Sequence, residues 1–126
     1  MVSRADGGLV FALCVDIDAD REKEFNTWYD KEHLPSVVAC PGVISGRRFT
    51  AERIGHGKQD IASYWAFYEV ESEAAMHSPQ ILALADDGFG PFADCVRHVR
   101  RYWFRQLVPQ FHEIPAGQLN ELAPSE

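Results

Sequence analysis

Residues 25–49 read FNTWYDKEHLPSVVACPGVISGRRF, and this stretch carries most of the information about the fold. An α-helix turns about 100° per residue. One face of a helix through the first part of the stretch therefore carries Phe25, Trp28, Tyr29 and Glu32, with His33 at its edge. An apolar face that also holds a carboxylate and an imidazole is unusual for a helix that only packs in a core. Buried ionisable groups have shifted pKa values and are frequent in functional sites.

The residues before and within this stretch predict a strand followed by a helix. Apolar side chains recur at every second position from Leu9 to Ile17, which is typical of a β-strand. Acidic residues at the start of the helix favour its N-terminus through the helix dipole. Pro35 disfavours helical geometry at Leu34, so we expect the helix to end or kink just after His33.

Three further strands and a second helix are predicted downstream. The strands should span residues 43–53, 61–70 and 98–107. The polar segment 55–60 should form a hairpin loop, Ser72 should cap the second helix, and Pro79 should split that helix. The order β-α-β-β-α-β predicts an α+β fold of the ferredoxin-like type, with an antiparallel four-stranded sheet.

The composition indicates a single domain. A chain of 126 residues with 46% hydrophobic and 25% charged residues can bury one core, which we place at about residues 8–112, before a loose C-terminal tail. The net charge of −7 argues against a nucleic-acid partner. No apolar run approaches the ~20 residues of a membrane span, and the N-terminus lacks the apolar core of a signal peptide. Three widely spaced cysteines fit reduced thiols, so we expect a cytoplasmic protein with no membrane partner.

Aromatic residues occur on both faces of the predicted third and fourth strands. Tyr64 and Tyr68 lie on the face opposite to Trp65, and Tyr102 lies on the face opposite to Trp103. Both helices of a ferredoxin-like fold cover one face of the sheet, so the second apolar face needs another cover. A second copy packed face to face would supply it, and we therefore expect a homodimer. The alternative is a monomer with many surface aromatics, which is uncommon.

One run of residues resembles a known family. Residues 28–35, WYDKEHLP, are followed by Pro41-Gly42-Val43 and by the strand residues Arg47-Arg48-Phe49. This pattern resembles the EthD-like branch of the dimeric α+β barrel superfamily. The resemblance implies a homodimer whose two sheets form a barrel, with a pocket between helices and sheet in each subunit. The superfamily includes cofactor-independent cyclases, isomerases and lyases, quinone-forming and haem-degrading monooxygenases, and purely binding proteins, so the fold does not fix the function.

His33 is the first candidate for chemistry. An imidazole moves protons near neutral pH when it is partly shielded and oriented. Asp30 precedes His33 by three residues and could orient the ring, and Tyr29, one turn before His33, could donate a hydrogen bond to a substrate oxygen. Alternatively, His33 only caps the carbonyl end of the helix, where a positive charge is favourable. The family resemblance, in which this histidine recurs, favours the catalytic role.

Other side chains are candidates for substrate binding. Glu32 either faces the apolar stripe as an acid, or it reaches water or pairs with Arg47 or Arg48, and we expect the pairing. Trp28 could line the wall of a pocket, although packing in the core is the simpler role for this residue. Aromatic surface for stacking on a substrate is offered by five residues, unless they belong to the core: Tyr64, Trp65, Tyr68, Tyr102 and Trp103.

Several further residues give weaker signals. His77 lies in the second helix, where we expect an exposed imidazole rather than one that faces a pocket. His98 and Arg100 share one strand face and Arg101 shares the other with Trp103, so one of these basic groups could meet an anionic substrate. Cys95 and His98 have C-x-x-H spacing without a second ligand pair, so we expect no metal site. No glycine-rich nucleotide-binding motif is present, so we expect no cofactor.

These features predict a cofactor-independent enzyme that performs histidine-based proton transfer on a small aromatic or enolisable substrate. Lyase, isomerase and cyclase chemistry fit equally well. The alternatives are a non-catalytic barrel that binds a small ligand and a monooxygenase that acts on a quinol or on haem. Haem degradation by the superfamily route typically uses an asparagine on the first strand, and residues 9–17 contain none.

Overall fold

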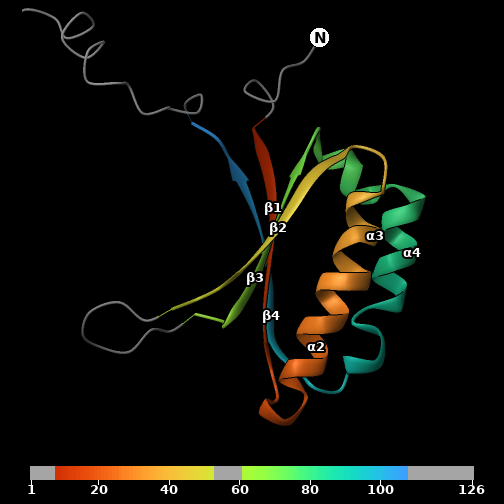
Figure 1. The fold of residues 1–126 in the computed structure, drawn as a ribbon. Helices are drawn as coiled ribbons and strands as arrows, with labels where there is room; N and C mark the ends of the chain where they lie inside the picture. Colours follow the sequence, from red (N-terminus) through yellow and green to blue (C-terminus); the bar gives the residue numbers. More distant parts are fainter. Residues whose placement is uncertain (1–7, 53–60, 108–126) are drawn as a thin grey trace, which may run out of the picture.

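A computed structural model describes residues 8–52 and 61–107 of the chain. Four strands form one antiparallel sheet in the order β2-β3-β1-β4 (Figure 1). The strands are β1 (Leu9–Ile17), β2 (Val43–Thr50), β3 (Tyr64–Val70) and β4 (Val96–Arg105). The predicted ferredoxin-like α+β fold is confirmed, with strand ends that differ by a few residues. The hairpin loop expected at 55–60 and the C-terminal tail lie outside the described residues.

A helical layer covers one face of the sheet (Figure 1). The first helical segment consists of η1 (Ala19–Arg21), α2 (Glu22–Trp28), η2 (Tyr29–His33) and α3 (Leu34–Val38). The second consists of η3 (Glu73–His77) and α4 (Pro79–Asp87), and η4 (Gly90–Phe92) precedes β4. Phe25 and Tyr29 are the largest fully buried side chains and belong to the core between layer and sheet. No helix in the described part of the chain is long and apolar enough to cross a membrane.

The first helix continues past His33, although Pro35 predicts that it ends or kinks there. η2 is a π turn, in which the N–H of Leu34 bonds to the carbonyl of Tyr29. Leu34 itself is helical, with φ −59° and ψ −49°, so the prediction that helical geometry fails at this residue is wrong. The physical reason is that the wider π turn relieves the clash between a proline ring and the carbonyl four residues earlier. The chain therefore remains helical into α3.

Pro79 divides the second helical segment, as predicted. η3 ends at His77 and α4 begins at Pro79. The capping bond comes from Ser78, whose hydroxyl oxygen accepts a hydrogen bond from the N–H of Ile81 at 3.2 Å. Ser72 occupies the N-cap position of η3 without a side-chain capping bond. Proline at the first helical position needs no hydrogen-bond partner for its nitrogen, which explains why the regular helix starts after Ser78.

The two faces of the sheet differ in what covers them. The described helices all lie on one side, against Leu13 of β1 and Tyr68 of β3 (Figure 1). On the other side, Trp65 stacks with Phe67 and Tyr102 at centroid distances of 5.7 and 5.9 Å. We call this second side the open face, and its aromatic residues are Phe49, Trp65, Phe67, Tyr102 and Phe104.

Candidate functional site

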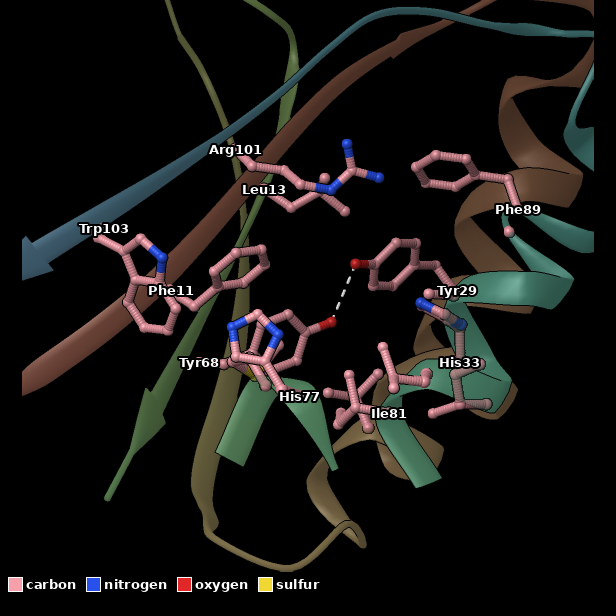
Figure 2. A pocket seen from close by; sticks show the side chains of 16 residues that line it. Phe11, Leu13, Tyr29, His33, Tyr68, His77, Ile81, Phe89, Arg101 and Trp103 are labelled. Atoms are coloured by element: carbon pink, nitrogen blue, oxygen red, sulfur yellow. Dashed lines mark hydrogen bonds between the residues drawn. The ribbon is translucent and has the colours of Figure 1, made fainter. Parts of the chain in front are cut away.

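A cavity of about 340 Å³ lies between the helical layer and the sheet. Residues from β1, β3 and β4 form one wall, and residues from η2, α3 and the second helical segment form the other (Figure 2). The lining is mostly apolar, and its aromatic residues include Phe11, Phe89 and Trp103. Sites for small molecules typically enclose about 300–1,000 Å³ and have apolar walls with a few polar groups. The cavity has the size and character of such a site.

Tyr29 and Tyr68 meet at the cavity wall through their hydroxyl groups. The two oxygens are 2.9 Å apart, and either hydroxyl can be the donor (Figure 2). Tyr29 comes from η2 and Tyr68 from β3, and the residues are only 1% and 2% exposed. Burial raises the pKa of both phenols, so both keep their protons at neutral pH. The wall therefore presents a neutral hydrogen-bonding pair to the cavity.

His33 lies beside the ring of Tyr29, one member of this pair, on the cavity wall. Its ring stacks on Trp28 at a centroid distance of 5.0 Å and meets the Tyr29 ring edge-on at 4.8 Å. Tyr29 and His33 are four residues apart on one helical segment, so their side chains are neighbours. The imidazole is half-buried, which gives it the partial shielding that a proton-transfer group requires. Trp28 supports the ring and is not among the cavity-lining residues.

Asp30, the predicted orienting partner of His33, binds Arg48 of β2 instead. Arg48 donates to Asp30 Oδ1 at 2.8 Å and to Asn26 Oδ1 at 2.9 Å. Its guanidinium also lies over the Tyr29 ring, 4.4 Å from the centroid. The Asp30–Arg48 pair thus ties the helical layer to the edge strand β2. This ion pair gives Asp30 a structural role, and a proton-exchange assay on Asp30→Asn tests whether Asp30 also orients His33.

The prediction that Glu32 forms an ion pair with an arginine of β2 is wrong. Arg48 of β2 forms its ion pair with Asp30. Glu32 is exposed. The physical reason is again the π turn, which rotates Glu32 away from the apolar stripe on which an ideal helix would place it. Arg47 lies on the open side of the sheet, where its guanidinium is 5.4 Å from the centroid of Phe49. Neither Glu32 nor Arg47 is among the residues that line the cavity.

The aromatic residues predicted to stack on a substrate have different positions. Trp103 lines the cavity and meets Phe11 edge-on at a centroid distance of 5.1 Å. Tyr64 is on the helical side of β3, where its hydroxyl donates to the carboxylate of Glu22. Trp65 lies on the open face and cannot reach the cavity. Successive residues of a strand point to opposite faces, which explains why Tyr64 and Trp65 separate.

Three polar residues with only weak signals in the sequence also line the cavity: Tyr68, His77 and Arg101. Strand alternation places Tyr68 on the same face as Tyr64, but no local signal places it opposite Tyr29, which is 39 residues away in the chain. His77 ends η3 with an exposed side chain, as expected, and still contributes to the lining. Arg101 comes from β4, on the strand face that it shares with Trp103 (Figure 2).

Metal ligation has little support in the described part of the chain. Residues 8–52 and 61–107 contain no group of three His, Cys, Asp or Glu side chains that could hold a metal ion. The two residues with C-x-x-H spacing have other contacts. Cys95 interacts with Asp94 and Arg21, and His98 Nδ1 is 2.9 Å from Asp16 Oδ2.

Several solved structures match the fold of this chain, whereas no family model and no curated protein sequence matches it. HapK from Hahella chejuensis has a TM-score of 0.59 at 14% identity, over 83% of this chain and 98% of that one. The heme-degrader MhuD from Mycobacterium tuberculosis, with two hemes bound in its active site, has a TM-score of 0.57 at 13% identity, over 82% and 99%. An EthD family protein from Bacillus halodurans has a TM-score of 0.53 at 14% identity, over 75% and 96%.

Identities this low show a shared fold and not a shared activity, because one fold can carry many sites. The long coverage of the matched structures shows that the likeness extends over the whole described domain. The chain therefore has the ferredoxin-like α+β fold of these proteins, and its likeness to the EthD family protein is a likeness of fold.

Proposed function

We propose that this chain is a cofactor-independent enzyme that moves protons on a small aromatic or enolisable substrate. One observation carries the proposal: half-buried His33 stands beside the buried Tyr29–Tyr68 hydroxyl pair on the wall of an apolar cavity. An imidazole is suited to take up and release a proton near neutral pH. Phenolic hydroxyls are suited to stabilise negative charge that develops on a substrate oxygen.

His33 acts in this mechanism as general base and then as general acid. It removes a proton from a carbon next to a carbonyl group, and the electron pair moves to the oxygen to form an enolate. The Tyr29–Tyr68 pair donates a hydrogen bond to that oxygen. Return of the proton to another carbon gives isomerisation, loss of a neighbouring group gives elimination, and attack on a second carbonyl gives cyclisation. The apolar walls strengthen the hydrogen bond because they exclude water.

Hydrogen–deuterium exchange at carbon tests the proposal without knowledge of the natural substrate. A proton-transfer enzyme should accelerate the replacement of α-protons in deuterium oxide, which proton NMR records directly. A suitable panel contains phenylpyruvate, benzoylacetate and propiophenone. We expect the wild type to accelerate exchange in at least one of them, and His33→Ala to slow the catalysed exchange by about 10²–10⁴-fold. His98→Ala is the matched control, because His98 binds Asp16 and is not part of the cavity lining.

Each other outcome points to a named alternative. Since the helix continues past His33, the non-catalytic alternative is that His33 only packs between Trp28 and Tyr29. His33→Ala should then lower the melting temperature and leave exchange unchanged. Binding of the panel without any exchange in the wild type would support a non-catalytic barrel that binds small ligands. A Soret band in the purified protein would support the haem enzyme, a role for which the heme-degrader MhuD provides a precedent on this fold.

We also propose that two copies of the chain associate through their open faces. Phe49, Tyr102 and Phe104 are exposed there, beside the half-buried Trp65 and Phe67. Contiguous apolar surface of this kind is uncommon on a monomer. A two-fold axis would let two identical open faces cover each other and close the assembly at a dimer.

A further inference from the structure

The side chains that line the cavity are rich in hydrogen-bond donors and lack strong acceptors. The lining contains no Asp, Glu, Asn, Gln, Ser or Thr residue. Its donors are Tyr29, Tyr68, Trp103 and Arg101, and the imidazoles of His33 and His77 can serve as either donor or acceptor. A ligand that matches this inventory must bring acceptors of its own.

The Tyr29–Tyr68 pair leaves one donor unused. Each phenol has one O–H, and the 2.9 Å bond between the two oxygens uses only one of the two protons. Neither hydroxyl makes a further hydrogen bond within the described residues. A buried donor without a partner costs about 1–3 kcal/mol. The second O–H therefore favours an acceptor that enters the cavity.

Arg101 adds a positive charge close to this spare donor. Its guanidinium lies on the cavity side of β4, near the Tyr29 ring (Figure 2). Burial raises the pKa of Tyr29, and the charge of Arg101 counteracts part of that rise, which is consistent with their proximity. Arg48 and Arg97 are neutralised by Asp30 and Asp18, respectively. No carboxylate of the described residues pairs in this way with Arg101.

We propose that the cavity binds a small aromatic acid, with its carboxylate held by Arg101 and its reacting carbonyl oxygen held by the spare hydroxyl of the Tyr29–Tyr68 pair. The aromatic part would contact Phe11, Phe89 and Trp103. One guanidinium balances one negative charge, so a carboxylate fits better than a doubly charged phosphate. The planar guanidinium can bind both carboxylate oxygens at once, which an ammonium group cannot do. The statement that this ligand is the substrate rests on the proposed function. Together, the two proposals narrow the substrate class to an aromatic acid whose reacting carbon lies near His33.

Binding of cinnamate, compared with its uncharged analogue cinnamyl alcohol, tests the charge requirement directly. Ligand-observed NMR or tryptophan fluorescence should show that the wild type binds cinnamate more tightly than the alcohol. Arg101→Gln should weaken cinnamate binding by about 10- to 100-fold, the loss expected for a hydrogen bond to a charged group, and leave the alcohol unaffected. Arg101→Lys should restore only part of the affinity. Arg100→Gln is the matched control, because it removes the same charge from the neighbouring position of β4. Arg100 is the register partner of Cys14 and lies on the sheet face opposite to that of Arg101.

Three results would overturn the inference. They are equal affinity of the wild type for cinnamate and cinnamyl alcohol, no binding of either, and an equal loss of cinnamate affinity in Arg100→Gln and Arg101→Gln. The last result would indicate a general effect of net charge instead of a site. The binding assay requires no turnover, so its outcome is separate from that of the proton-exchange assay. Arg101-dependent binding of cinnamate without proton exchange would support the anion site and contradict the proposed enzyme. Proton exchange that depends on His33 but not on Arg101 would support the enzyme and contradict the anion site.

Discussion

Asp30 and His33 are three residues apart on one helical segment, yet their side chains have different surroundings. His33 is half-buried between Trp28 and the cavity. The Asp30 side chain is 57% exposed and pairs with Arg48, whose side chain is 12% exposed. Arg48 is also in contact with Asn26 and with the ring of Tyr29. The acidic partner is therefore peripheral, while the arginine is part of the packing around the site.

This difference predicts effects of unequal size on stability for two substitutions. Asp30→Asn should lower the free energy of unfolding by at most about 1 kcal/mol, because an exposed ion pair contributes little. It should also leave proton exchange at the wild-type rate. Arg48→Gln should cost about 1–3 kcal/mol, because it removes a mostly buried charged donor from Asp30 and Asn26. Chemical denaturation and the exchange assay on both variants check these expectations. A loss of exchange in Asp30→Asn as large as that in His33→Ala would restore Asp30 as the orienting partner.

At the scale of the elements, Gly46 controls how closely α3 approaches the sheet. A Cβ atom on Gly46 would lie 2.8 Å from Val38 Cγ2, 3.0 Å from Tyr68 Cδ1 and 3.1 Å from Leu34 Cδ1. These neighbours are packed core side chains, and Tyr68 is also held by its bond to Tyr29. A methyl group at this position therefore cannot enter without moving the helix or the cavity wall.

Gly46→Ala should consequently lower the free energy of unfolding by about 1–3 kcal/mol, the usual cost of overpacking a core. Ser45→Ala is the neighbouring control, because it leaves the contact between α3 and the sheet unchanged and should cost less. Combining Gly46→Ala with Val38→Ala should recover part of the loss, since it removes the closest clashing atom. Denaturant titration of the three variants gives the comparison. Unchanged stability of Gly46→Ala would mean that α3 is not closely packed on β2.

The order of the elements could be predicted because it depends on local patterns. Alternating apolar residues at 9–17 produce β1, and proline at position 79 starts α4, as expected. The π turn at Tyr29–His33 could not be predicted from local patterns. The ideal helical repeat places Glu32 on the apolar face, and the usual effect of a proline places the end of the helix just before Pro35. That single turn accounts for the errors at Glu32, at Leu34 and in the choice between Asp30 and Glu32 as the partner of Arg48.

The candidate site was predictable where its residues are close in sequence. Tyr29 and His33 are one turn apart, and their adjacency follows from any helical model of this segment. Tyr68 and Arg101 join them only through the pairing of β1 with β3 and β4, which places Leu13 between Ala66 and Arg101. Such contacts depend on strand register, and register is fixed by the packing of the complete sheet.

At the scale of the whole molecule, the two sheet faces follow opposite patterns. One face is covered by helices and contains the cavity, and the other exposes aromatic side chains. On the open face, aromatic rings from β2, β3 and β4 form a continuous series of contacts. Phe49 of β2 contacts Phe67 of β3, and Phe67 contacts Phe104 of β4. Burying such a continuous apolar surface against a second copy would stabilise both protomers through the hydrophobic effect.

Light scattering at micromolar concentration should therefore give a mass near twice the 14.2 kDa of the chain. Phe104→Glu should produce a monomer, because Phe104 is 47% exposed in the protomer and a charge there would be buried only in the dimer. Leu82→Glu is the matched control, since Leu82 is 50% exposed on α4 in the helical layer, and it should remain dimeric. A monomeric wild type would remove the basis for the barrel. Dissociation by Leu82→Glu but not by Phe104→Glu would place the interface on the helical layer, because only a contact through that side is sensitive to a charge on α4.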